Sequence, residues 1–208
     1  MALLRLLNPV GEWVKKTNFI SACLSFWMFR LAYKLFPQLG CKGDEWRFVL
    51  DRLPKLGTKG ISVADIGGGL SLLPFELAKR GYEVTVYDQL PFKRKIKNKF
   101  KFIQSDVREI KEKNYDVVLC ISVIEHIGCG AYGDEIFSEG DSATLTKIYE
   151  MLKVGGLSII TTPHLNYCIE GDRKYAFAEI MRKVETAKMK VIASDYLSHQ
   201  IIIIAEKL

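Results

Sequence analysis

The sequence reads VADIGGGLS from Val63 to Ser71, a β-rich run that ends in an acid and a glycine-rich turn. Valine and isoleucine favour a strand, and successive glycines let the backbone of a turn approach a ligand closely. A helix is predicted from about Leu72, with Ser71 as N-cap and Pro74 in the first turn. Open α/β sheets bind ligands at such strand-to-helix turns, so this turn is the first candidate site.

The chain on either side alternates short β-rich runs with helical stretches, which is typical of a parallel sheet with crossover helices. Strands are predicted at 61–66, 83–88, 101–104, 115–120 and 157–162, and helices at 46–53, 72–80, 142–152 and 175–187. The last two β-rich runs, 190–193 and 200–205, are too close together for a helical crossover. They are therefore predicted to pair as an antiparallel hairpin.

Composition narrows the class of protein. A length of 208 residues fits one domain with an appendage, and 49% hydrophobic residues exclude a disordered chain. The excess of 30 Lys+Arg over 24 Asp+Glu, a net charge of +6, favours anionic partners without requiring them. The five cysteines are odd in number and form no CxxC pair, so the sequence indicates neither a disulfide framework nor a zinc finger. A reducing, cytoplasmic location is predicted.

Residues 1–44 are predicted to form a separate N-terminal helical segment in front of a predicted domain at 45–208. Its uncharged run, 18–29, is followed by Arg30 and Lys34, and is too short to span a membrane. Two interpretations stay open: a helix that packs on the domain as a lid over its ligand cleft, and an amphipathic helix that makes peripheral membrane contact through residues 18–36. The lid is favoured, because hydrophobic helices of this kind are commoner in packed domains.

Asp88 ends the second predicted strand about 20 residues after the glycines, where a carboxylate typically holds ribose hydroxyls. A dinucleotide-binding turn would carry a third Gly or Ala at position 72, but that residue is Leu72. The sequence therefore favours a nucleoside ligand over a dinucleotide.

From about Glu45 the chain resembles the class I S-adenosylmethionine-dependent methyltransferases. The resemblance rests on five ordered motifs: DIGGG at 65–69, Asp88, SDV at 105–107, YDVV at 115–118 running into SVIEH at 122–126, and LKVGG at 152–156. It implies an α/β fold with a Rossmann-like, mostly parallel seven-stranded sheet, a C-terminal antiparallel hairpin and helices on both faces. It also implies S-adenosyl-L-methionine as the cofactor.

The resemblance assigns roles to individual residues. It implies that Asp65 and the glycines hold the methionine moiety, that Asp88 binds the ribose, and that Asp106 contacts the adenine amine. The complete set of cofactor-binding residues that it implies is Asp65, Gly67, Gly68, Gly69, Asp88, Gln89, Ser105, Asp106, Val107, Ile121 and Ser122. In metal-assisted relatives a carboxylate stands three residues before the Glu of the EH pair, whereas this chain has Ser122 there, so no metal is assigned.

Methyl transfer from a sulfonium needs in-line positioning and, for an oxygen or nitrogen nucleophile, removal of a proton. His126 and His164 directly follow strands four and five, so both are candidate bases, although His126 is more often structural in this motif. Glu125 and Tyr132 are candidate substrate residues in EHIGCGAYGDEIFSEGD, residues 125–141. This segment resembles poorly characterised microbial methyltransferases, some of them associated with surface-glycan genes. It can wrap a polar substrate or serve as a solvated connection.

The favoured function is methyl transfer to a small-molecule acceptor, such as a glycan precursor or a lipid-linked metabolite. One alternative is an RNA or protein methyltransferase that docks through the lysine-rich stretch at 93–101, although a solvated linker is the commoner role of such a charge run. The other is a non-catalytic cofactor-binding subunit. The acceptor, the methylated atom and the oligomeric state are left open by the sequence.

Overall fold

The computed structural model describes residues 40–53, 60–92, 99–111, 113–130, 132–165, 171–197 and 199–208. The predicted lid or membrane segment at 18–36 lies outside the described residues, as does most of the lysine-rich stretch at 93–101. Within the described ranges, no helix combines the length and apolar character that a membrane span requires. The chain divides into two compact units, Met1–Pro54 and Lys55–Leu208.

The described part of the first unit is helix α3, Gly40–Arg52. Trp46 and Val49, which follow helical spacing, are buried. The helix begins earlier than expected and ends close to Pro54, because a proline ring cannot continue a helix. The predicted helix at 46–53 is therefore confirmed, with an earlier start.

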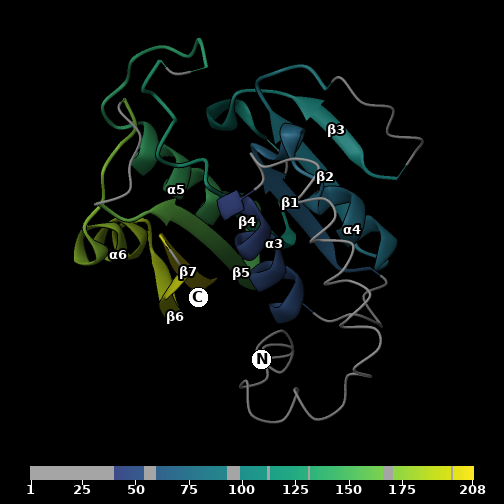
Figure 1. Cartoon of the computed structure of the whole chain (residues 1–208). Coiled ribbons are helices and arrows are strands. Elements are labelled where there is room, and N and C mark those ends of the chain that lie inside the picture. Colours follow the sequence, from purple (N-terminus) through teal and green to yellow (C-terminus); the bar gives the residue numbers. More distant parts are fainter. Residues whose placement is uncertain are drawn as a thin grey trace. The chain divides into compact units, whose positions relative to one another are not determined.

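The second unit is built on a seven-stranded sheet in the order β3-β2-β1-β4-β5-β7-β6 (Figure 1). Its strands are β1 (Ser62–Ile66), β2 (Glu83–Asp88), β3 (Lys101–Gln104), β4 (Tyr115–Ile121), β5 (Leu152–Pro163), β6 (Met189–Leu197) and β7 (Gln200–Lys207). Neighbouring strands among β1 to β5 pair in parallel, whereas β7 pairs antiparallel with both β5 and β6. The predicted parallel sheet with a C-terminal hairpin is confirmed.

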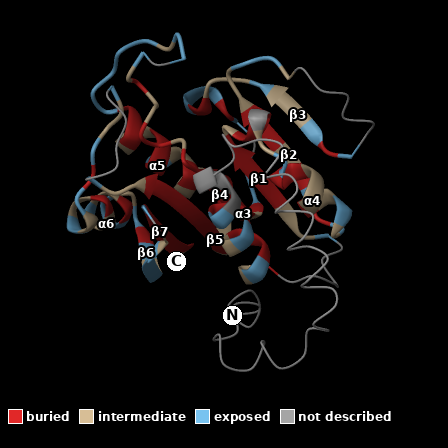
Figure 2. Ribbon diagram, viewed as in Figure 1, coloured by how far each residue is buried: buried red, intermediate tan, exposed pale blue. Residues whose placement is uncertain are grey.

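Helices cover the sheet as α4 (Leu73–Lys79), α5 (Gly140–Met151) and α6 (Phe177–Thr186), and two short 3-10 helices, η3 (Gly68–Leu70) and η4 (Val107–Glu109), follow β1 and β3. The main core cluster joins Leu145 of α5 and Ile180 of α6 to Val118 and Ile203 of the sheet. Figure 2 shows this interior as the buried central strands β1, β4 and β5 with exposed loops around them. One sheet face is thus closed by α5 and α6.

Alternate residues of the same strands belong to the other side of the sheet. Val63 pairs in register with Val84, and both are buried outside the main cluster. Helix α4 packs on β2 and contributes the buried Leu73 and Leu77. Strands that are apolar on both faces are typical of a parallel sheet covered on both sides.

Two local boundaries differ from the predictions. The predicted fifth strand at 157–162 is confirmed within β5, which begins earlier, because Leu152 already pairs with Tyr115; the glycines at 155 and 156 lie inside this strand, where its register against β4 shifts. The N-cap of α4 is Leu72, although the Oγ of Ser71 still accepts a hydrogen bond from the N–H of Leu73 at 3.0 Å. In that second case η3 occupies the turn and moves the helix start by one residue.

Hydrogen bonds beyond the strand ends hold one edge of the sheet together. The N–H of Gly67 donates to the carbonyl of Tyr87 at 2.7 Å, and the N–H of Ser105 donates to the carbonyl of Asp88 at 3.0 Å. Because the carboxyl ends of parallel strands meet at one edge, these bonds gather the loops after β1, β2 and β3. Most predicted site residues lie along this edge.

Candidate active site

The glycine turn after β1 is packed closely against the neighbouring strands. Gly67 has φ 71°, in the left-handed region that glycine adopts readily. A Cβ atom at Gly67 would collide with Val123, and one at Gly68 would collide with the carboxylate of Asp65. At Gly69 it would lie 2.6 Å from Oδ2 of Asp88. The glycines therefore allow both strand-end acids to approach the backbone of the turn.

Asp88 is held by two backbone donors. Its Oδ2 accepts from the N–H of Gly69 at 2.9 Å, and its Oδ1 accepts from the N–H of Leu90 at 2.9 Å. The adjacent Gln89 is tied to β3, because its carbonyl accepts from Nε2 of Gln104 at 3.0 Å. The loop after β2 is thus fixed with the Asp88 carboxylate next to the glycine turn.

These residues fit S-adenosylmethionine. Asp65 is buried beside the turn, where its carboxylate suits an ammonium group. The carboxylate of Asp88 has about four acceptor sites, so two backbone donors leave room for ribose hydroxyls. The structure brings together the acids of β1 and β2 and all three glycines, as predicted.

Asp106, predicted to contact adenine, also caps the 3-10 helix η4. Its Oδ1 caps η4 by accepting from the N–H of Arg108 at 2.8 Å, and its Oδ2 pairs with Nη2 of Arg108 at 2.7 Å. The side-chain hydrogen bonds from Arg108 hold the pKa of Asp106 below its usual value. Ser105 donates from Oγ to the carbonyl of Asp106, and Val107 is buried in the first position of η4. The contact with adenine remains a prediction.

The end of β4 has an unusual backbone. Ile121 is the last residue of β4, and Ser122 after it has φ 50°. The N–H of Ser122 is anchored to Thr161, 3.1 Å from the carbonyl oxygen and 2.9 Å from Oγ1. A non-glycine residue with positive φ is uncommon and clusters at functional sites. After this turn Val123 lies against the glycine turn, because a Cβ atom at Gly67 would collide with its side chain.

His126 lies between two carboxylates. Its Nδ1 is 2.8 Å from Oδ1 of Asp172, and its Nε2 is 3.8 Å from Oε1 of Glu125. The Glu125 side chain is only 1% exposed, against 20% for His126, so the imidazole is the more accessible of these two groups. Asp172 was missed by sequence reasoning. An acid in the loop after the fifth strand was the only signal, and acids are common in loops.

Tyr132 connects His126 to the cofactor side of the edge. Its ring meets the His126 ring edge-on, with centroids 5.3 Å apart. Its backbone carbonyl lies 3.4 Å from Nε2 of Gln89, and Gln89 is the residue that follows Asp88 in the chain. Burial, followed by the negative charges of Asp172, Glu125 and Asp88, raises the pKa of Tyr132. The predicted substrate residue Tyr132 therefore lies between the candidate base His126 and Gln89, the neighbour of the predicted ribose acid Asp88.

His164 has different neighbours. It follows β5, its N–H donates to the carbonyl of His199 at 2.9 Å, and its ring centroid lies 5.4 Å from that of Tyr196. Tyr196 in turn packs on Phe177 at the start of α6. Both histidines lie at the predicted edge, but His164 is packed against the hairpin.

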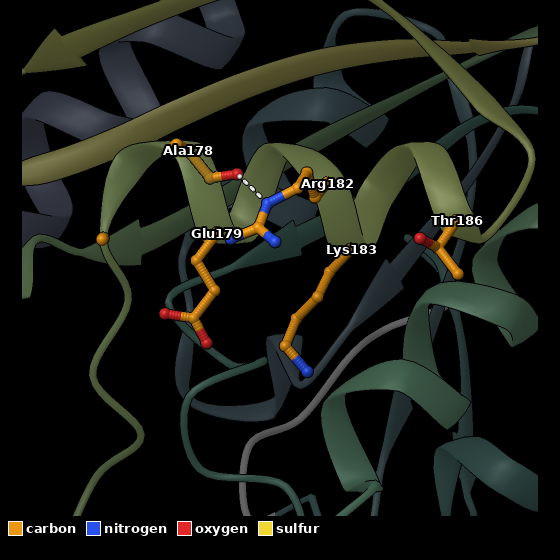
Figure 3. Close-up of a pocket in the computed structure, with 6 residues that line it drawn as sticks. Ala178, Glu179, Arg182, Lys183 and Thr186 are labelled. Carbon is orange, nitrogen blue, oxygen red and sulfur yellow. Dashed lines mark hydrogen bonds between the residues drawn. The ribbon is translucent and has the colours of Figure 1, made fainter.

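A hollow of about 560 Å³ lies elsewhere, on α6 (Figure 3). It is lined by Ala176, Ala178, Glu179, Arg182, Lys183 and Thr186. Figure 3 shows the Arg182 side chain turned back to the carbonyl of Ala178, with Nε 3.4 Å from that oxygen. None of the predicted site residues lines this hollow, so it is separate from the edge that carries the glycine turn.

The fold is the one found in class I S-adenosylmethionine-dependent methyltransferases, so the fold class predicted from the sequence is confirmed. The chain belongs to the family described as "Caenorhabditis protein of unknown function, DUF268", which matches residues 84–189.

Three solved structures are similar in fold. A TehB-like methyltransferase from Corynebacterium glutamicum has a TM-score of 0.62 at 14% identity, covering 87% of this chain and 98% of its own. A 1,6-didemethyltoxoflavin-N1-methyltransferase from Burkholderia thailandensis, with bound S-adenosylhomocysteine, has a TM-score of 0.61 at 16% identity. The match covers 99% of this chain and 88% of that one. The [4+2]-cyclase SpnF has a TM-score of 0.63 at 12% identity, and the match covers 79% of this chain and 80% of SpnF. The neighbours agree with the predicted cofactor, and SpnF illustrates that this fold also carries other reactions.

Curated relatives agree on the class. The "Ubiquinone biosynthesis O-methyltransferase" of Rickettsia akari is 29% identical over 111 residues, which cover 49% of this chain and 40% of the relative. The protein of the same name from Rickettsia canadensis is also 29% identical, covering 49% and 42%. The chain therefore spans less than half the length of these relatives.

Proposed function

We propose that the chain is an S-adenosylmethionine-dependent methyltransferase that acts on a small-molecule acceptor. The observation that carries this proposal is that Asp65 and Asp88 both lie against the glycine turn: Asp65 is next to Gly68, and the Asp88 carboxylate accepts from the N–H of Gly69. Methyltransferases among the relatives and structural neighbours support it.

Each acid has a separate binding task in this proposal. Asp65 holds the ammonium of the methionine moiety, Asp88 accepts from the ribose hydroxyls, and Asp106 lies on the adenine side. When bound, S-adenosylmethionine supplies a methyl group attached to a sulfonium sulfur. The sulfur is a good leaving group because it departs as a neutral thioether. The chain then contributes orientation of the acceptor and removal of its proton.

Exposed apolar side chains support an acceptor with an apolar part. Among the described residues, six large apolar side chains that follow the carboxyl ends of β1, β2, β4 and β5 are exposed: Leu72, Leu90, Tyr132, Ile136, Phe137 and Leu165. Exposed apolar groups that gather on one edge mark a binding surface more often than scattered ones. A lipid-linked metabolite suits this rim, and the name of the Rickettsia relatives is in keeping with that class. A glycan precursor rests on the resemblance of residues 125–141 alone.

The alternatives have weaker support. Docking of RNA or protein depends on residues 93–101, most of which lie outside the described ranges, and the relatives and neighbours give this alternative no support. A non-catalytic subunit is likewise unsupported. The cytoplasmic location stays a proposal, in keeping with the free thiols of Cys120 and Cys129 in the described part of the chain.

The test follows the methyl group. The chain is incubated with a cell extract and S-adenosylmethionine deuterated in the methyl group, and the low-mass, RNA and protein fractions are analysed separately by mass spectrometry. The proposal expects a labelled compound in the low-mass fraction that Asp88→Ala fails to produce. Label that appears only in RNA or protein would contradict a small-molecule acceptor.

A further inference from the structure

The pair His126–Asp172 joins two loops that are distant in sequence. Nδ1 of His126 lies 2.8 Å from Oδ1 of Asp172, and the side chains are 20% and 8% exposed. At this length the contact is a charge-assisted hydrogen bond. The better buried partner is the carboxylate, so the imidazole is the member of the pair that reaches toward solvent.

The loop that carries Asp172 is fastened in place. The N–H of Arg173 donates to the carbonyl of Glu125 at 3.0 Å. Its Nη2 donates to the carbonyls of Ile127 at 2.8 Å and Phe137 at 2.6 Å. Three bonds from a single arginine thus fix the distance between the loop after β5 and the loop after β4. Asp172, directly before Arg173, is thereby held next to His126.

No described residue lies within hydrogen-bond distance of the other ring nitrogen, Nε2. Nε2 of His126 is 3.8 Å from Oε1 of Glu125, which is too long for a hydrogen bond. Tyr132 meets the ring edge-on, and its backbone carbonyl accepts from Nε2 of Gln89, the neighbour of Asp88, at 3.4 Å. Nε2 therefore belongs to the same edge as the proposed cofactor site.

We propose that Asp172 is a positioning residue that holds His126 with its proton on Nδ1, so that Nε2 acts as the general base on an acceptor hydroxyl. This inference rests on the proposed methyltransferase function. A carboxylate only accepts hydrogen bonds, so a neutral His126 must donate to it from Nδ1 and keep the lone pair on Nε2. Asp172 acts through His126 and does not touch the acceptor.

The chemistry explains why the acceptor atom is a hydroxyl oxygen. A neutral amine already presents a lone pair, whereas a hydroxyl becomes a strong nucleophile only as its proton leaves. The proton passes from the acceptor oxygen to Nε2, and the oxygen–methyl bond forms as the sulfur–methyl bond breaks. The electron pair of the broken bond stays on sulfur, which becomes a neutral thioether. The positive charge is then on the imidazolium, between Asp172 and Glu125.

The first experiment needs no acceptor. The full chain is labelled with nitrogen-15 in its histidine rings, and ring nitrogens are observed by NMR at about pH 8.5, above the ordinary titration range of histidine. The chain has three histidines, and His126→Gln identifies the His126 signals by their loss. The proposal expects the His126 proton on Nδ1, and expects Asp172→Asn to move much of it to Nε2, because an asparagine amide can donate to Nδ1. A His126 proton on Nε2 in the unaltered chain, or no change in Asp172→Asn, overturns the proposal.

The second experiment measures turnover. Transfer of deuterated methyl from S-adenosylmethionine into hydroxyl compounds of the extract is compared for the unaltered chain, His126→Gln and Asp172→Asn. The proposal expects roughly a hundredfold or larger loss of rate in both variants, with cofactor affinity unchanged in calorimetry. Asp195→Asn, at an exposed position on β6, is the matched control and should keep the full rate.

The outcomes separate this inference from the proposed function. Full turnover by Asp172→Asn, or label found on nitrogen or carbon, overturns the role of the pair while leaving the methyltransferase intact. Failure of the unaltered chain to bind S-adenosylmethionine overturns the proposed function itself, and the general-base role with it.

Discussion

Oδ2 of Asp88 accepts a hydrogen bond from the backbone N–H of Gly69 across 2.9 Å. This bond joins the end of β2 to the turn after β1, where a Cβ at Gly68 would meet Asp65. A carboxylate that backbone donors already hold has little side-chain freedom left to lose when a ligand binds. Removal of the Asp88 carboxylate is therefore expected to act mainly on cofactor binding.

Asp88→Ala should weaken binding of S-adenosylmethionine at least about tenfold, because a charge-assisted hydrogen bond contributes roughly 1.5–3 kcal/mol. Isothermal titration calorimetry measures the affinity. Glu83→Ala is the matched control, because Glu83 is an exposed acid at the opposite end of the same strand. Equal affinity in folded Asp88→Ala and in the control would show that the ribose lies elsewhere.

Gly67→Ala should destabilise the fold more than Gly60→Ala. Both glycines have positive φ, 71° and 83°, so alanine at either site carries a similar backbone cost. An added Cβ at Gly67 would also collide with Val123, whereas at Gly60 nothing lies within 4 Å. Overpacking typically costs about 1–3 kcal/mol, and urea denaturation of both variants should reveal that excess. Equal losses would mean that Val123 moves aside freely.

Asp141 should make the stability of the fold sensitive to acid. Its Oδ2 lies 3.0 Å from both the Tyr175 hydroxyl and Nζ of Lys183. Burial acts to raise the pKa of Asp141, but the hydrogen bonds from Lys183 and Tyr175 outweigh it and keep the pKa below its usual value. Its folded pKa therefore lies below the value of about 3.9 in the unfolded chain. The stabilisation is complete above that value and is lost as the pH falls through the folded pKa.

The check compares the free energy of unfolding of the unaltered chain and Asp141→Asn in urea from about pH 7 to pH 2.5. The difference should be roughly 1.5–3 kcal/mol at neutral pH and should shrink below about pH 4. Asp195→Asn, on the exposed part of β6, should change the free energy of unfolding little throughout the pH range. A difference between the chain and Asp141→Asn that stays constant across the range would contradict this role for Asp141.

The strands near the glycine turn could be predicted closely because their signals are local. The predicted range 101–104 coincides with β3, and the predicted 83–88 coincides with β2. Short apolar runs bounded by turn residues carry this information within a few positions. The order of the acidic and glycine motifs likewise placed Asp65 and Asp88 at one edge.

The remaining features depend on contacts across the fold. The early start of β5 depends on the pairing of Leu152 with Tyr115. The local sequence, with glycines at 155 and 156, gave no sign of a strand there. The contact of Asp172 with His126 joins residues 46 positions apart, and no local pattern marks it. Arg108, two residues after Asp106, was visible in the sequence, but only the η4 turn brings its guanidinium back onto that carboxylate.

The most direct test of the central claim is a calorimetric titration of the full chain with S-adenosylmethionine. We expect saturable binding to one site per chain, with S-adenosylhomocysteine competing for the same site. No heat of binding and no rise in the thermal midpoint at millimolar S-adenosylmethionine would contradict it.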